Sequence, residues 1–188
     1  MKPSSFRRSL LFLEGGLLSR VQNHFLSFAH GVRTALLFHV EVDANRTTVT
    51  RRWSTGACKQ PVSMAIDTGH HRLFSGCRSG VMAVSDYQAG KAVATVPIGT
   101  GVDGAGYDAA SANAFASNAD GTLTVIHQDS PDQYRVIQTL QTPQGSRNMG
   151  LDPTNHRVFV VSARFGTAPG RGRPPVLPGT FSLMVIEP

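Results

Sequence analysis

Residue types that carry catalysis or bind metals occur in this sequence, but their spacing matches no catalytic motif. The chain contains no G-x-S-x-G nucleophile elbow, no H-E-x-x-H zinc site and no P-loop. Two adjacent histidines, His70 and His71, come closest to a metal site, yet no Asp, Glu or Cys accompanies them at ligand spacing. The glycine-rich stretch at 99–106 opens no helix, as a phosphate-binding loop would. The sequence therefore predicts no catalytic residue, metal or cofactor.

Charge is distributed unevenly along the 188 residues, whose net charge is +6. Residues 1–60 hold nine Lys/Arg and three Asp/Glu, whereas residues 61–188 hold nine of each. The balance in the longer part disfavours a nucleic-acid-binding domain, and DNA binding through the basic first 60 residues is only a weak alternative. No stretch is long and apolar enough to span a membrane.

The elements that must position any site recur along the chain. Asp67, Asp108 and Asp152 are each followed seven residues later by a phenylalanine, at 74, 115 and 159, so the copies are 41 and 44 residues apart. Each copy alternates short β-favouring runs with turns rich in Asp, Gly, Asn and Pro. A four-stranded antiparallel unit with this period is typical of a β-propeller blade, in which the phenylalanines would pack between blades.

The repeat predicts an all-β fold of about three and a half blades. A half blade covers 35–60, full blades cover 61–100 and 101–145, and an incomplete blade covers 146–188. His71 and His156 share one repeat position, which indicates a role in the turn between the first two strands rather than in metal binding.

The copies resemble the YVTN-type seven-bladed propeller repeats of bacteria and archaea. The tetrapeptide FASN at 115–118 stands where that family has its Tyr-Val-Thr-Asn signature, and 90–99 and 152–161 are similar to its linker and first turn. The resemblance covers about 36–188 and implies a periplasmic or secreted protein. Seven blades need roughly 300 residues at this period. We therefore expect a fragment of a larger propeller, whose open blade edges invite self-association.

Residues 1–34 do not follow the repeat. Their basic start and apolar run resemble a signal peptide, but Glu14 and Gly15-Gly16 interrupt the run and no clear cleavage site follows. We expect this basic segment to be helical or disordered.

Alternating strand directions place the loops on two faces, and ligands of propellers usually bind at a loop rim. One face collects the loop entering each first strand and the loop after each second strand. The candidate ligand-binding residues on this rim are Arg78, Asp103, Asn118, Arg147 and, in a long insert at 163–180, Arg164. An unknown small molecule or protein is the expected partner.

Cys58 and Cys77 fall on the same rim, at the ends of adjacent strands of one blade. A disulfide between them is geometrically plausible. Two free thiols are the alternative if the protein stays in a reducing compartment.

These observations favour a non-catalytic propeller-type binding or scaffold protein, part of a larger exported propeller. The alternative is a lactonase- or oxidoreductase-like propeller enzyme, which would hold a metal or cofactor through acids from several blades. Asp103 is the one acid on the rim at the start of a first strand; the other copies have Val62 and Arg147 there.

Overall fold

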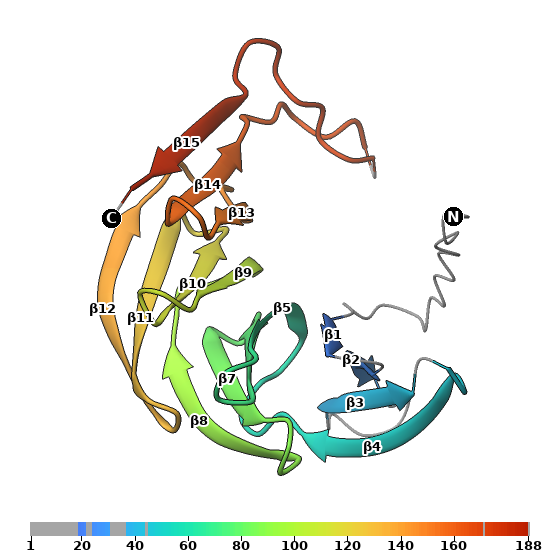
Figure 1. The fold of residues 1–188 in the computed structure, drawn as a ribbon. Coiled ribbons are helices and arrows are strands. Elements are labelled where there is room, and N and C mark those ends of the chain that lie inside the picture. The colour runs from blue at the N-terminus through green and yellow to red at the C-terminus, as the bar shows by residue number, and fades with distance from the viewer. Residues whose placement is uncertain (1–18, 22–23, 31–36, 44, 171, 188) are drawn as a thin grey trace, which may run out of the picture.

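The computed structural model describes residues 19–21, 24–30, 37–43, 45–170 and 172–187. The regular secondary structure within these ranges consists of β-strands alone. The strands form separate sheets that follow one another around an open arc (Figure 1). Within each sheet, every strand pairs antiparallel with its neighbours in sequence. The expected all-β class is confirmed, and the sheets do not close into a ring.

The strands fall into four sheets, numbered here from the N-terminus. Sheet 1 contains β1 (Ser19–Val21), β2 (His24–His30), β3 (Leu37–Asp43) and β4 (Thr48–Ser54). Sheet 2 contains β5 (Pro61–Asp67), β6 (Arg72–Cys77), β7 (Val81–Asp86) and β8 (Lys91–Pro97). Sheet 3 contains β9 (Val102–Asp108), β10 (Asn113–Asn118), β11 (Thr122–Ser130) and β12 (Gln133–Gln141). Sheet 4 contains β13 (Asn148–Asp152), β14 (Arg157–Ser162) and β15 (Ser182–Ile186).

Sheet 1 begins earlier than the sequence predicts. β2 pairs with β3 along its whole length, and β1 pairs with β2. β2 provides partners for backbone groups of β3 that a half blade would leave unpaired. The structure thus differs from the predicted boundary at residue 35, because residues 19–21 and 24–30 are strands rather than parts of a helical or disordered segment. The remainder of 1–34 lies outside the described residues.

The turn after each first strand is held by the aspartate of the repeat. Asp67 Oδ1 accepts hydrogen bonds from the backbone N–H groups of Gly69 and His70, at 2.9 and 3.2 Å. The last residue of this turn is in the left-handed region in all three copies, with φ of 61° at His71, 54° at Ala112 and 58° at His156. Asx turns followed by a left-handed residue reverse the chain tightly. The predicted turn role of the two histidines is confirmed.

The apolar core lies between the sheets rather than within any one of them. Phe74 is fully buried in a cluster that joins sheet 2 to sheet 3, where its ring stacks on Tyr107 with the centroids 4.8 Å apart. Phe115 occupies the same position one sheet later and packs against Val158 and Val160 of sheet 4. The predicted packing of the repeat phenylalanines between blades is confirmed for these two positions.

Candidate functional site

Three of the five predicted rim residues meet in one cluster of charges. Asp103, the second residue of β9, lies between Arg78 and Arg147: Oδ1 is 3.7 Å from Nη2 of Arg78, and Oδ2 is 3.7 Å from Nε of Arg147. Each residue comes from a different sheet, since Arg78 follows β6 and Arg147 precedes β13. The arginine side chains are half exposed, at 50% and 53%, and the aspartate is 28% exposed. We call these three residues the rim cluster.

Close backbone approach brings the rim cluster together. A Cβ on Gly104 would stand 2.5 Å from Ser117 Oγ and 3.1 Å from the Arg147 carbonyl oxygen, so only glycine allows this contact between sheets 3 and 4. The Ser117 hydroxyl donates a hydrogen bond to that same carbonyl and so anchors the backbone of Arg147. Arg78 is held from the other side, because its backbone N–H donates to the Gln60 carbonyl at 3.0 Å.

The other two predicted residues lie apart from the rim cluster. Asn118 is fully buried, and its Nδ2 donates to the Ala116 carbonyl and to the hydroxyls of Thr122 and Thr124 at 3.0–3.2 Å. Asn118, the last residue of β10, therefore points inward and holds the following turn in place through these hydrogen bonds. It is not a surface contact. Arg164 is exposed at the start of the insert, where its backbone N–H donates to Thr180 Oγ1 at 3.0 Å.

A disulfide lies beside the rim cluster. Cys58, between β4 and β5, is bonded to Cys77 at the end of β6, with the two Cα atoms 5.4 Å apart. Both residues are buried against Ala83 and Val81. The bond ties the loop that precedes sheet 2 to the strand end that positions Arg78.

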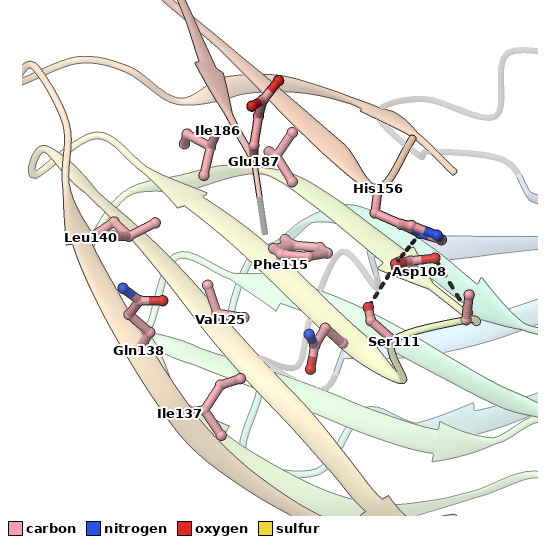
Figure 2. A pocket seen from close by; sticks show the side chains of 13 residues that line it. Asp108, Ser111, Phe115, Val125, Ile137, Gln138, Leu140, His156, Ile186 and Glu187 are labelled. Atoms are coloured by element: carbon pink, nitrogen blue, oxygen red, sulfur yellow. Dashed lines mark hydrogen bonds and ion pairs between the residues drawn. The ribbon is translucent and has the colours of Figure 1, made fainter. Parts of the chain in front are cut away.

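A second feature lies at the opposite end of the sheets, where β9 ends and β10 begins. It is a cavity of about 440 Å³ between sheets 3 and 4 (Figure 2). Its apolar walls come from Phe115 and Val125 of sheet 3, from Ile137 and Leu140 of β12, and from Ile186 of β15. This size suits a small ligand or a large side chain. The sequence repeat carried no signal for it.

One end of the cavity is polar. Asp108 is 2% exposed, and its Oδ2 accepts hydrogen bonds from Ser111 Oγ at 2.6 Å and from His156 Nδ1 at 2.8 Å. Burial raises the pKa of Asp108, but hydrogen bonds from Ser111, Ala110 and His156 outweigh it and hold the pKa below its usual value. An ionised carboxylate therefore holds the imidazole of His156 in place.

An ion-pair network around a buried arginine lies between sheets 2 and 3. Arg72 is 8% exposed and pairs with Asp86 at 3.0 Å and with Asp132, in the β11–β12 turn, at 2.8 Å. Beside it, burial raises the pKa of Tyr107 and raises that of Tyr134 to about 12, so both phenols stay protonated and can donate hydrogen bonds. Tyr107 donates to Gln128 and Tyr134 to the Pro131 carbonyl.

The described residues contain no group of three or more His, Cys, Asp and Glu that could hold a metal ion. His70 does have a carboxylate neighbour, since its Nδ1 is 2.7 Å from Oδ2 of Asp67. No helix among the same residues is long and apolar enough to cross a membrane.

Solved structures with the same arrangement of sheets identify the fold. Hydrazine synthase of Kuenenia stuttgartiensis aligns with a TM-score of 0.61 at 16% identity, over 81% of this chain and 46% of that one. BamB from Moraxella catarrhalis aligns with a TM-score of 0.58 at 10% identity, over 77% of this chain and 39% of that one. Both are β-propeller proteins, so the chain has the fold of a partial propeller.

The chain spans less than half the length of these two propellers. No protein-family model and no curated protein sequence matches it.

Proposed function

We propose that the chain is part of a larger exported propeller of the YVTN type, which acts as a non-catalytic binding or scaffold protein. The rim cluster is the binding surface, and its partner is an anionic polypeptide. The observation that carries this proposal is that three sheets each place one charged side chain at a single point of the rim, with two arginines for one carboxylate.

The geometry of the rim cluster allows a carboxylate of the partner to replace Asp103 as the ion-pair partner of either arginine. Separations of 3.7 Å are longer than charge-assisted hydrogen bonds, and the side chains are partly exposed. Exposed pairs of this kind contribute at most about 1 kcal/mol, so either arginine can leave Asp103 at little cost. A guanidinium then offers paired N–H donors to a carboxylate of the partner.

Export is supported by the disulfide between Cys58 and Cys77. Such bonds persist in the periplasm and outside the cell, and are rare in a reducing cytosol. The resemblance of residues 36–188 to YVTN repeats supports the same compartment.

Fluorescence anisotropy with labelled hexaglutamate as probe tests the proposal. We expect binding that weakens with salt, and a loss of about fivefold or more for Arg78→Ala and for Arg147→Ala. Arg135→Ala is the matched control, since Arg135 is an exposed arginine of β12 that pairs with Asp129 at 2.9 Å and lies outside the rim cluster. Asp103→Asn should strengthen binding, because it removes the carboxylate that competes with the probe.

Arg164 gives a further comparison. If Arg164→Ala weakens hexaglutamate binding as much as Arg147→Ala does, the binding surface extends over the insert. Equal affinity for hexaglutamate and hexaglutamine, or equal losses in the Arg135 and Arg147 variants, would count against the rim as an anion-binding surface.

A further inference from the structure

The turn between β6 and β7, which carries Arg78, is hydrogen-bonded to the loop that enters sheet 2. The Arg78 N–H donates to the Gln60 carbonyl at 3.0 Å, and the Ser79 N–H donates to the Lys59 carbonyl at 3.3 Å. In return, the Lys59 N–H donates to Ser79 Oγ at 3.0 Å. We call these three hydrogen bonds the turn clamp.

The turn clamp recurs in sheet 3, 41 residues later. The Ala119 N–H donates to the Gly101 carbonyl at 3.1 Å, and the Asp120 N–H donates to the Thr100 carbonyl at 3.3 Å. The Thr100 N–H donates to Asp120 Oδ2 at 2.5 Å, as Lys59 does to Ser79. The clamp is thus a feature of the repeat. The turn of sheet 3 has Ala119 at the position of Arg78, so only the clamp of sheet 2 holds a charged side chain of the rim cluster.

The two clamps differ in what lies beneath them. In sheet 2, Cys58 and Cys77 are joined by the disulfide, and they are 3% and 0% exposed. In sheet 3, the equivalent residues are Gly99 and Asn118, which cannot form such a bond. A Cβ on Gly99 would stand 2.6 Å from Asn118 Nδ2, so the amide lies against this position. The covalent bond therefore coincides with the turn that carries an arginine of the rim.

The ion pair of Arg78 does little to hold its turn in place. The side chain is 50% exposed, and its Nη2 is 3.7 Å from Asp103 Oδ1. An exposed pair of this length contributes little to order. The position of the guanidinium relative to Asp103 and Arg147 therefore depends on the backbone of the turn, which begins at the residue after Cys77.

We propose that the disulfide between Cys58 and Cys77 is the positioning element of the rim cluster, and that it raises the affinity for an anionic polypeptide through Arg78. This inference rests on the proposed function of the rim cluster. A side chain whose backbone is fixed before binding loses less conformational entropy when the partner binds. Both cysteines are buried, and buried cysteines are chemically inert, so the bond is a fixed constraint rather than a switch.

A double-mutant cycle on the full chain tests the proposal, with fluorescence anisotropy of labelled hexaglutamate as the readout. The Cys58→Ala/Cys77→Ala variant should bind about threefold more weakly than the unsubstituted chain. The same pair of substitutions should cause no further loss in an Arg78→Ala background, and should still cause about a threefold loss in an Arg147→Ala background. A bond that only stabilised the fold would act alike in both backgrounds.

Amide hydrogen exchange measured by NMR without any ligand gives a second readout. Loss of the disulfide should speed exchange of the Arg78 and Ser79 amides, because the clamp then opens more often. The amides of Ala119 and Asp120 are the matched control, since they make the equivalent hydrogen bonds in sheet 3. Their exchange should not change.

Urea unfolding establishes that the disulfide-free variant is folded. If the alanine pair does not fold, Cys58→Ala/Cys77→Val takes its place in both measurements, because valine restores part of the apolar volume that the sulfur atoms fill.

Three results would overturn the inference and leave the proposed function standing. These are hexaglutamate binding that does not weaken without the disulfide, equal losses in the Arg78→Ala and Arg147→Ala backgrounds, and unchanged exchange at Arg78 and Ser79. If the unsubstituted chain does not bind hexaglutamate at all, the proposed function itself is wrong, and the inference is wrong with it.

Discussion

The interface between sheets 2 and 3 and the interface between sheets 3 and 4 use the same repeat positions with different results. In the first, Phe74 is fully buried beneath Tyr107 and Tyr134. In the second, Phe115 is 8% exposed and lines a cavity of about 440 Å³. The repeat thus supplies the walls of each interface, and the fourth strand of the following sheet decides whether it is filled.

Polar contacts differ between the two interfaces in the same way. Arg72 pairs with Asp86 of its own sheet and with Asp132 of the next sheet, and is nearly buried. Among the described residues, Arg157, its equivalent in sheet 4, has only the first kind of contact, with Glu187 at 2.8 Å, and its side chain is 46% exposed. One repeat position therefore carries either a bridge between sheets or a surface ion pair.

Truncation of the first of the two phenylalanines should give the largest loss of stability. Phe74→Ala should lower the free energy of unfolding by about 4 kcal/mol, because it removes a fully buried ring from a close-packed cluster. Phe115→Ala should cost at least about 1 kcal/mol less, since part of its ring already borders a cavity. Urea unfolding followed by tryptophan fluorescence measures both. Equal losses would show that the two interfaces are equally well packed.

Removal of Arg72 should give the next largest loss of stability, and removal of Arg157 a much smaller one. Arg72→Ala should cost about 3 kcal/mol, because it leaves polar groups of two sheets without their buried partner. Arg157→Ala should cost less than about 1 kcal/mol, as expected for an exposed pair. The same unfolding measurement in 0.1 M and 1 M salt should show screening for the Arg157 pair only. A small loss at Arg72 would mean that the network does not bridge the sheets.

The interface between sheets 1 and 2 contains a buried histidine, His39. His39 stands four residues before the end of β3, at the position of Met82 in β7. It is fully buried, with Nε2 2.8 Å from Ser75 Oγ and Nδ1 3.2 Å from Ser85 Oγ. Burial lowers its pKa to about 4 from an unfolded value of 6.5.

Acid should therefore weaken this interface, with the smallest effect of the three. Between pH 6.5 and 4 the unfolded chain binds the proton that folded His39 excludes, so the contribution is complete above the unfolded pKa and is lost as the pH falls. The loss at pH 5 relative to pH 7 should be about 2 kcal/mol. Urea unfolding at both pH values measures it, and His39→Met should flatten the dependence. If the unsubstituted protein and the His39→Met variant show the same pH dependence of stability, groups other than His39 cause it.

Much of the fold could be predicted from the residues because each blade is a local structure. The spacing of Asp and Phe placed the strands of sheets 2 and 3, and the turn position shared by His71 and His156 was read correctly from their equivalence. Residues 19–30 follow no such spacing, and only the pairing of β2 with β3 and of β1 with β2 shows that those described are strands.

The candidate site was less accessible to prediction. Sorting the loops by strand direction placed Arg78, Asp103 and Arg147 on one rim, and these three meet in the structure. The same sorting placed Asn118 there, although its side chain turns inward. Alternation along a strand determines which face a residue occupies, but at a strand end the turn geometry decides its direction.

The sequence by itself determined the repeat: its period, its turns and the apolar residues that each sheet offers to its neighbours. These features depend on the alternation of side chains between the two faces of a strand and on the residue types in the turns, both of which extend over only a few residues. Only the tertiary structure decided which side chains meet across sheets, including the rim cluster, the pairing of Arg72 with Asp132 and the cavity beside Phe115. Such contacts depend on how each sheet is rotated against the next and on which fourth strand covers it, and neither is contained in the pattern of a single blade.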